Sequence, residues 1–398
     1  MKLPHPDQRN AILNERRNLK MARSPHAYMR GNTVKFYEWL HSAKGQATPH
    51  GPPIWICGDC HSGNLGPLAD AEGKIILEIR DFDQTLIGNP AHDLVRLALS
   101  LATAARGSSL PGVVTARMLE NIMYGYRQAF SPDPEQKRPR RPTPVRWTMR
   151  QAAKRTWKQL AVERIANTRP VIPLGKSFWP LAAEEHDGVH ALFATPEVLD
   201  LVRDLKSRSN DARVEVLDAA YWVKGCSSLG LLRYAVLLEI GNKKNSELCL
   251  VDIKQAVGAA GPRYNHVSMP RDNAHRVVAG ARHLSPALGD RMVAQRFLDQ
   301  GVFLRELLPQ DLKLEIDQLN LADATKVARY LANVVGHAHA RQMDDAVKAK
   351  WQADLTPDRN TALAAPDWLW DSTLQLIAAH EIGYLEHCRK YALSHKAS

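Results

Sequence analysis

The sequence predicts an α+β protein in which helical segments flank a central run of strands. Apolar residues recur at helical spacing in residues 93–130 and 321–344. Between them, residues 214–254 alternate strand-like runs with turns rich in Gly and Ser. Near the start of the chain, two acidic loops around Asp59 and Asp81 each follow a short apolar run of the kind found in buried strands.

The composition is that of a soluble globular protein. The chain has 398 residues, of which 44% are hydrophobic and 24% charged, enough for two or three domains or lobes with their own cores. No apolar run approaches the roughly 18 residues of a membrane span, and the N-terminal residues lack the apolar core of a secretion signal. We therefore expect a cytoplasmic protein without a membrane span. Five cysteines in this length do not indicate a disulfide scaffold.

Two helices are predicted before the first acidic loop, in residues 9–22 and 33–43. The segment 24–31 that joins them begins with Ser-Pro and ends with Arg-Gly. Arg23 and Arg30 lie at this joint, where they could reach a phosphate group or the acidic loops, or could pair with surface carboxylates.

The first acidic loop, residues 58–64, follows an apolar run at 54–57 that predicts a buried strand. It places Asp59 and Asn64 five positions apart, with His61 between them. In protein kinases an Asp, four residues and an Asn form the catalytic loop, whose Asp acts on the acceptor hydroxyl and whose Asn binds a metal ion. We expect catalytic roles for Asp59 and His61 and metal binding by Asn64. Alternatively, the polar groups only satisfy the local backbone of a turn.

The second acidic loop follows a predicted hairpin in residues 66–80 and begins with Asp81-Phe82-Asp83. Kinases use an Asp directly before a Phe to hold Mg²⁺. Because a hairpin can bring its flanking loops together, we expect Asp81 and Asp83 to bind Mg²⁺ together with Asn64. The alternative is that the two Asp residues cap a helix.

Helices and a basic segment are predicted next. Two packed helices are expected in residues 93–130, with Asp93 capping the first. Residues 131–145 are rich in Pro and charge and predict a linker. Much of the net charge of +11 comes from residues 137–169, which include a predicted helix at 146–166. This segment is typical of a solvated helix face, and it could also attract nucleic acid, membrane phosphates or an acidic substrate.

Strands are predicted at 214–224, 231–240 and 247–254, and residues 225–230 form a Gly/Ser loop between the first two. Such a loop can present backbone N–H groups to a triphosphate, and a lysine on a following strand can contact the α- and β-phosphates. We therefore expect ATP to be bound by Gly225, Ser227, Ser228, Gly230 and Lys254.

The remaining elements are a helix at 273–284, a strand at 302–307 and helices at 321–344 and 366–392. In kinases the helix after the lysine strand carries a Glu that pairs with the lysine. No Glu lies in residues 273–284, so the sequence leaves the partner of Lys254 unassigned.

Three motifs in order carry a resemblance to the aminoglycoside and choline phosphotransferase branch of the kinase-like fold. They are Gly-Asp-x-His-x-x-Asn at 58–64, Asp-Phe-Asp at 81–83 and Gly-x-Pro-x-x-Asp-Leu at 88–94. The resemblance implies a protein-kinase-like fold of two lobes. Here the catalytic loop precedes the Gly/Ser loop, the reverse of the kinase order, so we expect a circularly permuted lobe order.

The whole chain also resembles a bacterial family, domain of unknown function 2252. Its motifs match residues 21–31, 58–64, 81–83, 225–230, 254–256 and 338–341. The sequence departs from the family pattern in the order of Arg and Met at 21–23, and Tyr28 stands for Phe. Arg80 also stands for Asn, Ser227 for Gly and Gln255 for Glu.

These observations predict four segments. Residues 1–130 would carry the catalytic and metal loops, 131–213 a basic helical insert, 214–310 the nucleotide-binding lobe, and 311–398 helices that complete the helical lobe. The predicted function is a phosphotransferase that uses ATP and Mg²⁺ to phosphorylate an unknown small-molecule or protein acceptor. The alternatives are a nucleotide-binding regulator without turnover and, less favoured, a nucleic-acid-binding protein that uses residues 137–169.

Overall fold

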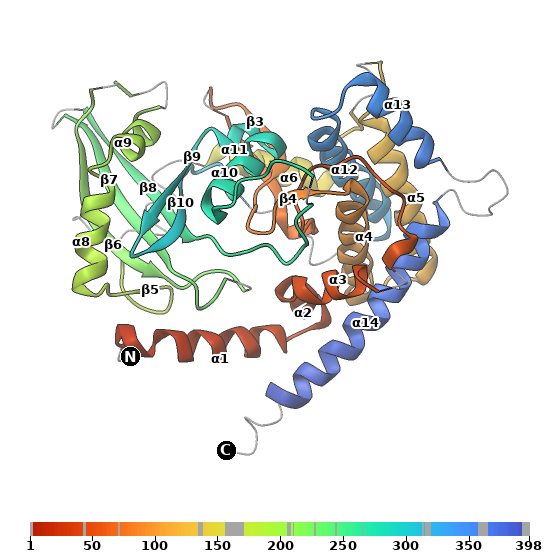
Figure 1. Cartoon of the computed structure of the whole chain (residues 1–398), viewed down its shortest axis with the longest axis horizontal. Helices are drawn as coiled ribbons and strands as arrows, with labels where there is room; N and C mark the ends of the chain where they lie inside the picture. Colours follow the sequence, from red (N-terminus) through yellow and green to blue (C-terminus); the bar gives the residue numbers. More distant parts are fainter. Residues whose placement is uncertain are drawn as a thin grey trace.

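A computed structural model places a sheet region and a helical region side by side (Figure 1). The structure describes residues 3–42, 45–70, 72–133, 138–155, 171–204, 208–209, 211–226, 228–242, 245–264, 266–312, 314, 320–356 and 365–391. The expected α+β class is confirmed, because helices and a large antiparallel sheet both occur and are partly segregated along the chain. None of the helices in these ranges is both long enough and apolar enough to cross a membrane.

The largest sheet has six strands in the order β5-β6-β7-β8-β10-β9, with every neighbouring pair antiparallel. Two small antiparallel pairs, β1–β4 and β2–β3, lie near the predicted acidic loops. The strands are β1 (Ile54–Ile56), β2 (Leu65–Ala69), β3 (Ile75–Ile79), β4 (Leu86–Gly88), β5 (Phe178–Trp179), β6 (Val214–Trp222), β7 (Arg233–Asn242), β8 (Asn245–Gln255), β9 (Met292–Phe297) and β10 (Gln300–Leu307).

Several helices begin where the sequence provides a capping side chain. Ser24, Asn89, Asp272 and Asn320 each accept a hydrogen bond from a backbone N–H in the first turn of α2, α4, α10 and α12. The helices are α1 (Arg9–Met21), α2 (Pro25–Gly31), α3 (Thr33–Leu40), α4 (Pro90–Gly107), α5 (Gly112–Gln128), α6 (Thr143–Lys154), α8 (Ala183–Leu192), α9 (Pro196–Arg203), α10 (Asn273–Leu284), α11 (Pro286–Gly289), α12 (Leu321–Ala340), α13 (Asp345–Asp354) and α14 (Asp367–Tyr391).

Most predicted elements are confirmed to within a few residues, and the differences have local causes. The helix expected at 321–344 ends at Ala340, because the Asp344 side chain accepts a hydrogen bond from Val347 N–H and starts α13. The segment 24–31, predicted as a joint between two helices, contains helix α2, which begins at Pro25 because Ser24 caps it. The short strands β4, β5 and β9 and the helices α8, α11 and α13 were also not predicted. The basic helix expected at 146–166 begins earlier, at Thr143, and residues 156–170 lie outside the described residues.

The two faces of the six-stranded sheet differ in chemistry because side chains alternate along each strand. On β8, Val251 and Ile253 point into an apolar cluster that also contains buried residues of α1, α8 and α9. The alternate β8 residues Asp252 and Lys254 therefore point to the opposite face. This face also carries Arg305 from β10, which pairs in register with Asp252, and it is turned toward the helical region (Figure 1).

The helical region is built around close packing of α5 against α12. A Cβ atom on Gly125 of α5 would lie 2.0 Å from the carbonyl oxygen of Arg329 on α12. A Cβ atom on Gly336 of α12 would lie 2.7 Å from both the Ala129 Cβ and the Tyr126 carbonyl oxygen. Glycine at these two positions thus lets the two backbones approach each other.

We expect Gly125→Ala to lower the free energy of unfolding by about 1–3 kcal/mol, because the backbones must separate to admit a methyl group. Gly107→Ala is the matched control: it also lies in a helix, but its Cβ would meet nothing within 4 Å. That variant should be neutral or stabilising by up to about 1 kcal/mol. Urea denaturation followed by circular dichroism measures both, and equal effects would contradict this account of the packing.

Candidate functional site

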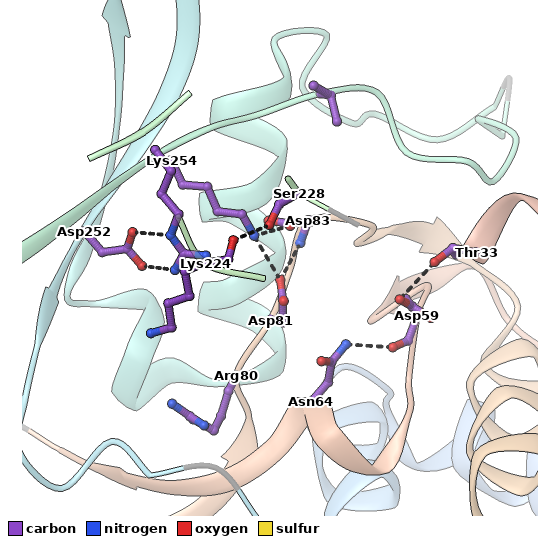
Figure 2. A network of polar contacts seen from close by, with 12 residues as sticks. Thr33, Asp59, Asn64, Arg80, Asp81, Asp83, Lys224, Ser228, Asp252 and Lys254 are labelled. Atoms are coloured by element: carbon purple, nitrogen blue, oxygen red, sulfur yellow. Dashed lines mark hydrogen bonds and ion pairs between the residues drawn. The ribbon is translucent and has the colours of Figure 1, made fainter. Parts of the chain in front are cut away.

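The loop after β3 and the strand β8 meet through an ion pair that joins Asp83 to Lys254 (Figure 2). The Lys254 Nζ also lies 3.8 Å from Asp81 Oδ1, so the ammonium is shared by both carboxylates. Lys254 is only 5% exposed. The sequence left the partner of Lys254 unassigned, and the structure shows that Lys254 pairs with Asp83, 171 positions away in the sequence.

The two carboxylates differ in their ionisation. Burial raises the pKa of Asp81, but the charges of Lys254 and Arg305 outweigh it and leave the pKa below its usual value. For Asp83, burial and the neighbouring Asp81 charge raise the pKa, and Lys254 offsets this only in part. Asp81 is thus held as the anion, with a side chain that is 45% exposed.

The oxygen donors of this loop suit a hard divalent cation. Asp83 Oδ1 is buried and has no hydrogen-bond partner among the described residues. Asp81 and Asn64 both line one cavity of the protein. The described residues contain no group of three or more His, Cys, Asp and Glu side chains placed to hold a metal. An ion bound here would have two carboxylates and one carboxamide and would complete its shell with water or phosphate oxygens, as Mg²⁺ commonly does.

Asp59 lies in a different environment, buried in the loop after β1 (Figure 2). Its Oδ1 accepts a hydrogen bond of 2.7 Å from Arg96 Nε, and its Oδ2 accepts one of 2.9 Å from the Thr33 hydroxyl. Burial raises the pKa of Asp59, and the Arg96 guanidinium offsets this only in part. The carboxylate is therefore held in one orientation by side chains from α3 and α4.

His61 and Asn64 shape the same loop. His61 Nδ1 accepts a hydrogen bond from Gly63 N–H, so a neutral ring carries its proton on Nε2, which faces Asp59 Oδ2 at 3.9 Å. The Asn64 side-chain amide donates to the backbone carbonyl of Asp59 at 2.9 Å. These contacts close the loop into a compact turn and place His61 and Asn64 on the wall of the cavity.

The sequence predicts that Asp93 caps α4, but in the structure Asn89 occupies the N-cap position. Its fully buried carboxylate accepts hydrogen bonds from the backbone N–H groups of Cys57 and Gly58, at 2.8 and 2.9 Å. His339 Nε2 lies 3.1 Å from the same carboxylate. Asp93 thus fixes the backbone that carries Asp59.

A second polar network lies beside Lys254 on the sheet. Asp252 accepts two hydrogen bonds from Arg233, at 2.9 and 2.6 Å, and two from Arg305, at 3.2 and 3.0 Å. Burial raises the pKa of Asp252, but the two guanidiniums outweigh it and hold the pKa well below its usual range. Asp252 thus binds both guanidiniums, while the neighbouring Lys254 pairs with Asp81 and Asp83.

Helix α10 also contacts the loop after β3 that carries Asp81 and Asp83. The Arg276 guanidinium donates to three backbone carbonyls, those of Asp83, Thr85 and Val257. Helix α10 therefore contacts the loop after β3 through an arginine. The partners of Lys254 are the carboxylates of Asp81 and Asp83 in that loop.

The Gly/Ser loop between β6 and β7 lies over this site. Gly225 and Gly230 both have φ of +99°, a conformation that glycine adopts readily and other residues rarely. Gly225 and Ser228 line the cavity together with Lys254. The Lys20 ammonium donates to the Gly225 carbonyl at 2.7 Å. Ser227 lies outside the described residues.

These elements enclose a single cleft of about 1190 Å³, which we call the main cleft. Nine Lys and Arg side chains and three Asp side chains line it. One wall comes from α6, including Trp147, which is 64% exposed, and Lys154. Part of the predicted basic segment thus faces the main cleft, and nucleic-acid binding by residues 137–169 stays a prediction. A cleft with this charge attracts polyanions such as nucleoside triphosphates.

Sequence reasoning missed the residues that hold the predicted ones in place: Thr33, Asp93, Arg96, Arg233, Arg276, Arg305 and His339. Asp93 and His339 do stand in recognisable motifs, Gly-x-Pro-x-x-Asp-Leu and Ala-His-Ala-Arg. The buried arginines have no comparable local signal.

The fold and the site together define a mixed α/β protein with a polar, cationic cleft beside an antiparallel sheet. The model of one family, described as uncharacterised proteins conserved in bacteria (domain of unknown function 2252), matches residues 9–390. The chain belongs to this family. Neither the curated proteins nor the solved structures yielded a match.

We expect Asp252→Asn to cost about 3 kcal/mol or more at pH 7, because it removes the carboxylate shared by the buried Arg233 and the partly buried Arg305. The Asp252 pKa is lower in the folded protein than in the unfolded chain, where it is about 3.9. Its stabilising contribution is therefore complete above about pH 5 and is lost as the pH falls below about 4. The variant should show a weaker loss of stability between pH 5 and pH 3.

Chemical denaturation at a series of pH values tests this. Asp345→Asn is the control, because the Asp345 side chain is 100% exposed. A variant at position 252 that keeps the wild-type acid dependence would contradict the assigned role of the carboxylate.

Proposed function

We propose that this protein is a kinase-like phosphotransferase that binds ATP with Mg²⁺ and transfers the γ-phosphoryl group to a hydroxyl of an acceptor. The observation that carries the proposal is the pairing of Asp81 and Asp83 with Lys254, where Asp81 and Lys254 line one cationic cleft. Kinases use such an Asp and lysine to hold the metal and the phosphates of one nucleotide. The nearby loop that carries Asp59 would supply the third part of a kinase site, the catalytic loop.

In this proposal the cationic groups bind the triphosphate. Lys254 and the backbone of the loop from Gly225 to Gly230 contact phosphate oxygens. Asn64, Asp81 and Asp83 would hold Mg²⁺, which would neutralise the negative charge that the phosphates share. The Lys254 ammonium pairs with both carboxylates and so holds the loop that would bind the metal next to the strand that would bind the phosphates.

Asp59 is assigned to the acceptor hydroxyl, whose proton it would accept. His61 is less suited to this step, because its Nδ1 accepts from Gly63 N–H and its Nε2 faces Asp59. Burial raises the pKa of Asp59, which makes this carboxylate a better proton acceptor than an ordinary surface carboxylate. Arg96 and Thr33 keep the carboxylate oriented.

The proposal includes a two-lobed kinase-like architecture with a permuted order. The sheet region would act as the nucleotide lobe. The helical region, with the catalytic loop near its start and α12 and α14 near its end, would act as the second lobe. The side-by-side arrangement of these regions in Figure 1 is compatible with this assignment.

We expect the wild-type protein to bind ATP in a Mg²⁺-dependent manner, and Asp81→Asn to weaken that binding by about 100-fold or more. The physical reason is that Mg²⁺ would lose a negatively charged ligand, which would lower the binding energy of the Mg²⁺–ATP complex by several kcal/mol. Isothermal titration calorimetry with and without Mg²⁺ measures this, with Asp345→Asn as the control. Failure of the wild type to bind ATP under either condition would overturn the proposal.

Asp59→Asn separates an enzyme from a nucleotide-binding regulator. We expect it to retain ATP affinity, because Asp59 is assigned to the acceptor, and to lower basal ADP formation by about 10²–10⁴-fold. A coupled assay for ADP measures the rate, with water as the basal acceptor. A wild-type protein that binds ATP and forms no ADP, with or without added hydroxyl compounds, would favour the regulator.

A further inference from the structure

A second cavity, which we call the side cavity, lies next to the main cleft and is bounded by α2, the C-terminal end of α4 and α14. It has a volume of about 640 Å³, which is within the range of small-molecule sites. None of the described residues that line it is assigned to ATP, to Mg²⁺ or to the acceptor hydroxyl. A ligand in the side cavity would therefore be bound without taking part in the transfer.

The side cavity has an excess of positive charge. Its lining includes the cationic side chains of Lys20, Arg23, Arg30 and Arg106, against one carboxylate among the described residues, that of Glu381. Glu381 pairs with Arg106 at 2.7 Å, so it balances only one of the four cations. A cationic ligand would be repelled by this lining, and an anionic group is the complementary partner.

His380 adds an unsatisfied hydrogen-bond acceptor to this lining. The residue is 4% exposed, and its Nδ1 lies 2.9 Å from the Leu376 carbonyl oxygen, so Nδ1 carries the proton. Burial, with a contribution from the Arg96 charge, lowers the pKa of His380 to about 3, which keeps the ring neutral. Its Nε2 is buried without a partner in the described part of the chain, so a ligand hydroxyl that donates to it would remove the cost of an unsatisfied acceptor.

Two cations belong to both the side cavity and the main cleft. Lys20 and Arg30 line both, so their charges act on a ligand in either one. Lys20 donates to the carbonyl of Gly225 in the Gly/Ser loop at 2.7 Å. A Cβ atom on Gly63 would lie 2.7 Å from a terminal nitrogen of Arg30, which shows that this guanidinium packs on the loop of Asn64. The two cavities are therefore separated by a layer of side chains and are linked electrostatically through it.

We propose that the side cavity is a regulatory site for a small anion that carries a hydroxyl group, and that this anion weakens nucleotide binding in the main cleft. The sign follows from charge, because two anionic ligands repel each other across the layer and share Lys20 and Arg30 as counter-ions. By thermodynamic linkage, the nucleotide weakens binding of the anion by the same factor. The linkage rests on the proposed ATP binding, whereas the anion site itself does not.

The site is tested with inorganic phosphate, which is titrated by calorimetry into the full-length protein with the main cleft saturated by Mg²⁺ and a non-hydrolysable ATP analogue. The double variant R23Q/R106Q removes two cations that line the side cavity and not the main cleft. Both arginines are exposed, so the variant should fold, and R117Q is the matched control because Arg117 is an exposed arginine on α5. We expect the wild type and R117Q to bind phosphate and R23Q/R106Q to bind it at least about 10-fold more weakly. Equal affinity in the double variant and the wild type would overturn the site.

The linkage is tested by titrating the analogue with and without saturating phosphate. Direct competition by phosphate in the main cleft should be the same in every variant. We expect phosphate to weaken analogue binding by about 5-fold or more beyond this in the wild type and R117Q, and not in R23Q/R106Q. An equal effect in all three proteins would overturn the regulatory role. If the analogue binds to none of them, the proposed function fails, whereas phosphate titrations without analogue still compare the side cavity of the wild type with that of the double variant.

Discussion

The buried carboxylate of Asp93 accepts hydrogen bonds from the backbone N–H groups of Cys57 and Gly58 and from His339 on α12. Further hydrogen bonds extend this network. The Tyr126 hydroxyl lies 2.9 Å from His339 Nδ1 and accepts a hydrogen bond from Trp351 Nε1. These contacts join β1, α4, α5, α12 and α13 in one solvent-free network. A buried charge of this kind is tolerated only when every oxygen is satisfied, so the network constrains all five elements at once.

On the sheet side of the candidate site, too, charged side chains are paired with groups of opposite charge. Asp252 pairs with two arginines, while Lys254 on the same strand face pairs with Asp83 in the loop after β3. The sheet therefore contributes fixed positive charge, and the helical region contributes most of the oxygen donors. The two regions therefore meet through groups of opposite charge, which attract each other at the main cleft.

Much of the fold followed from local patterns. The hairpin β2–β3, helix α10 and the strands β6 to β8 were predicted because each has a clear period and a recognisable cap or turn. The candidate residues Asp81, Asp83 and Lys254 were predicted from motif spacing, and the structure brings them together. Their supporting arginines could not be predicted, because an Arg on a helix has the same local pattern whether it is solvated or, like Arg276, binds backbone carbonyls 19 to 193 positions away. Short elements such as β9 were missed because few residues carry their pattern.

The helical region is assembled from both ends of the chain. Contacts such as His339 with Asp93, Trp39 with Gln375 and Tyr384 with Ala22 span 246, 336 and 362 positions. During synthesis, the segment that carries the catalytic loop emerges from the ribosome long before α12 and α14 exist to cover its apolar surface. Its core can close only after nearly the whole chain has been translated, so high contact order should make folding slow and make the nascent chain a client of chaperones.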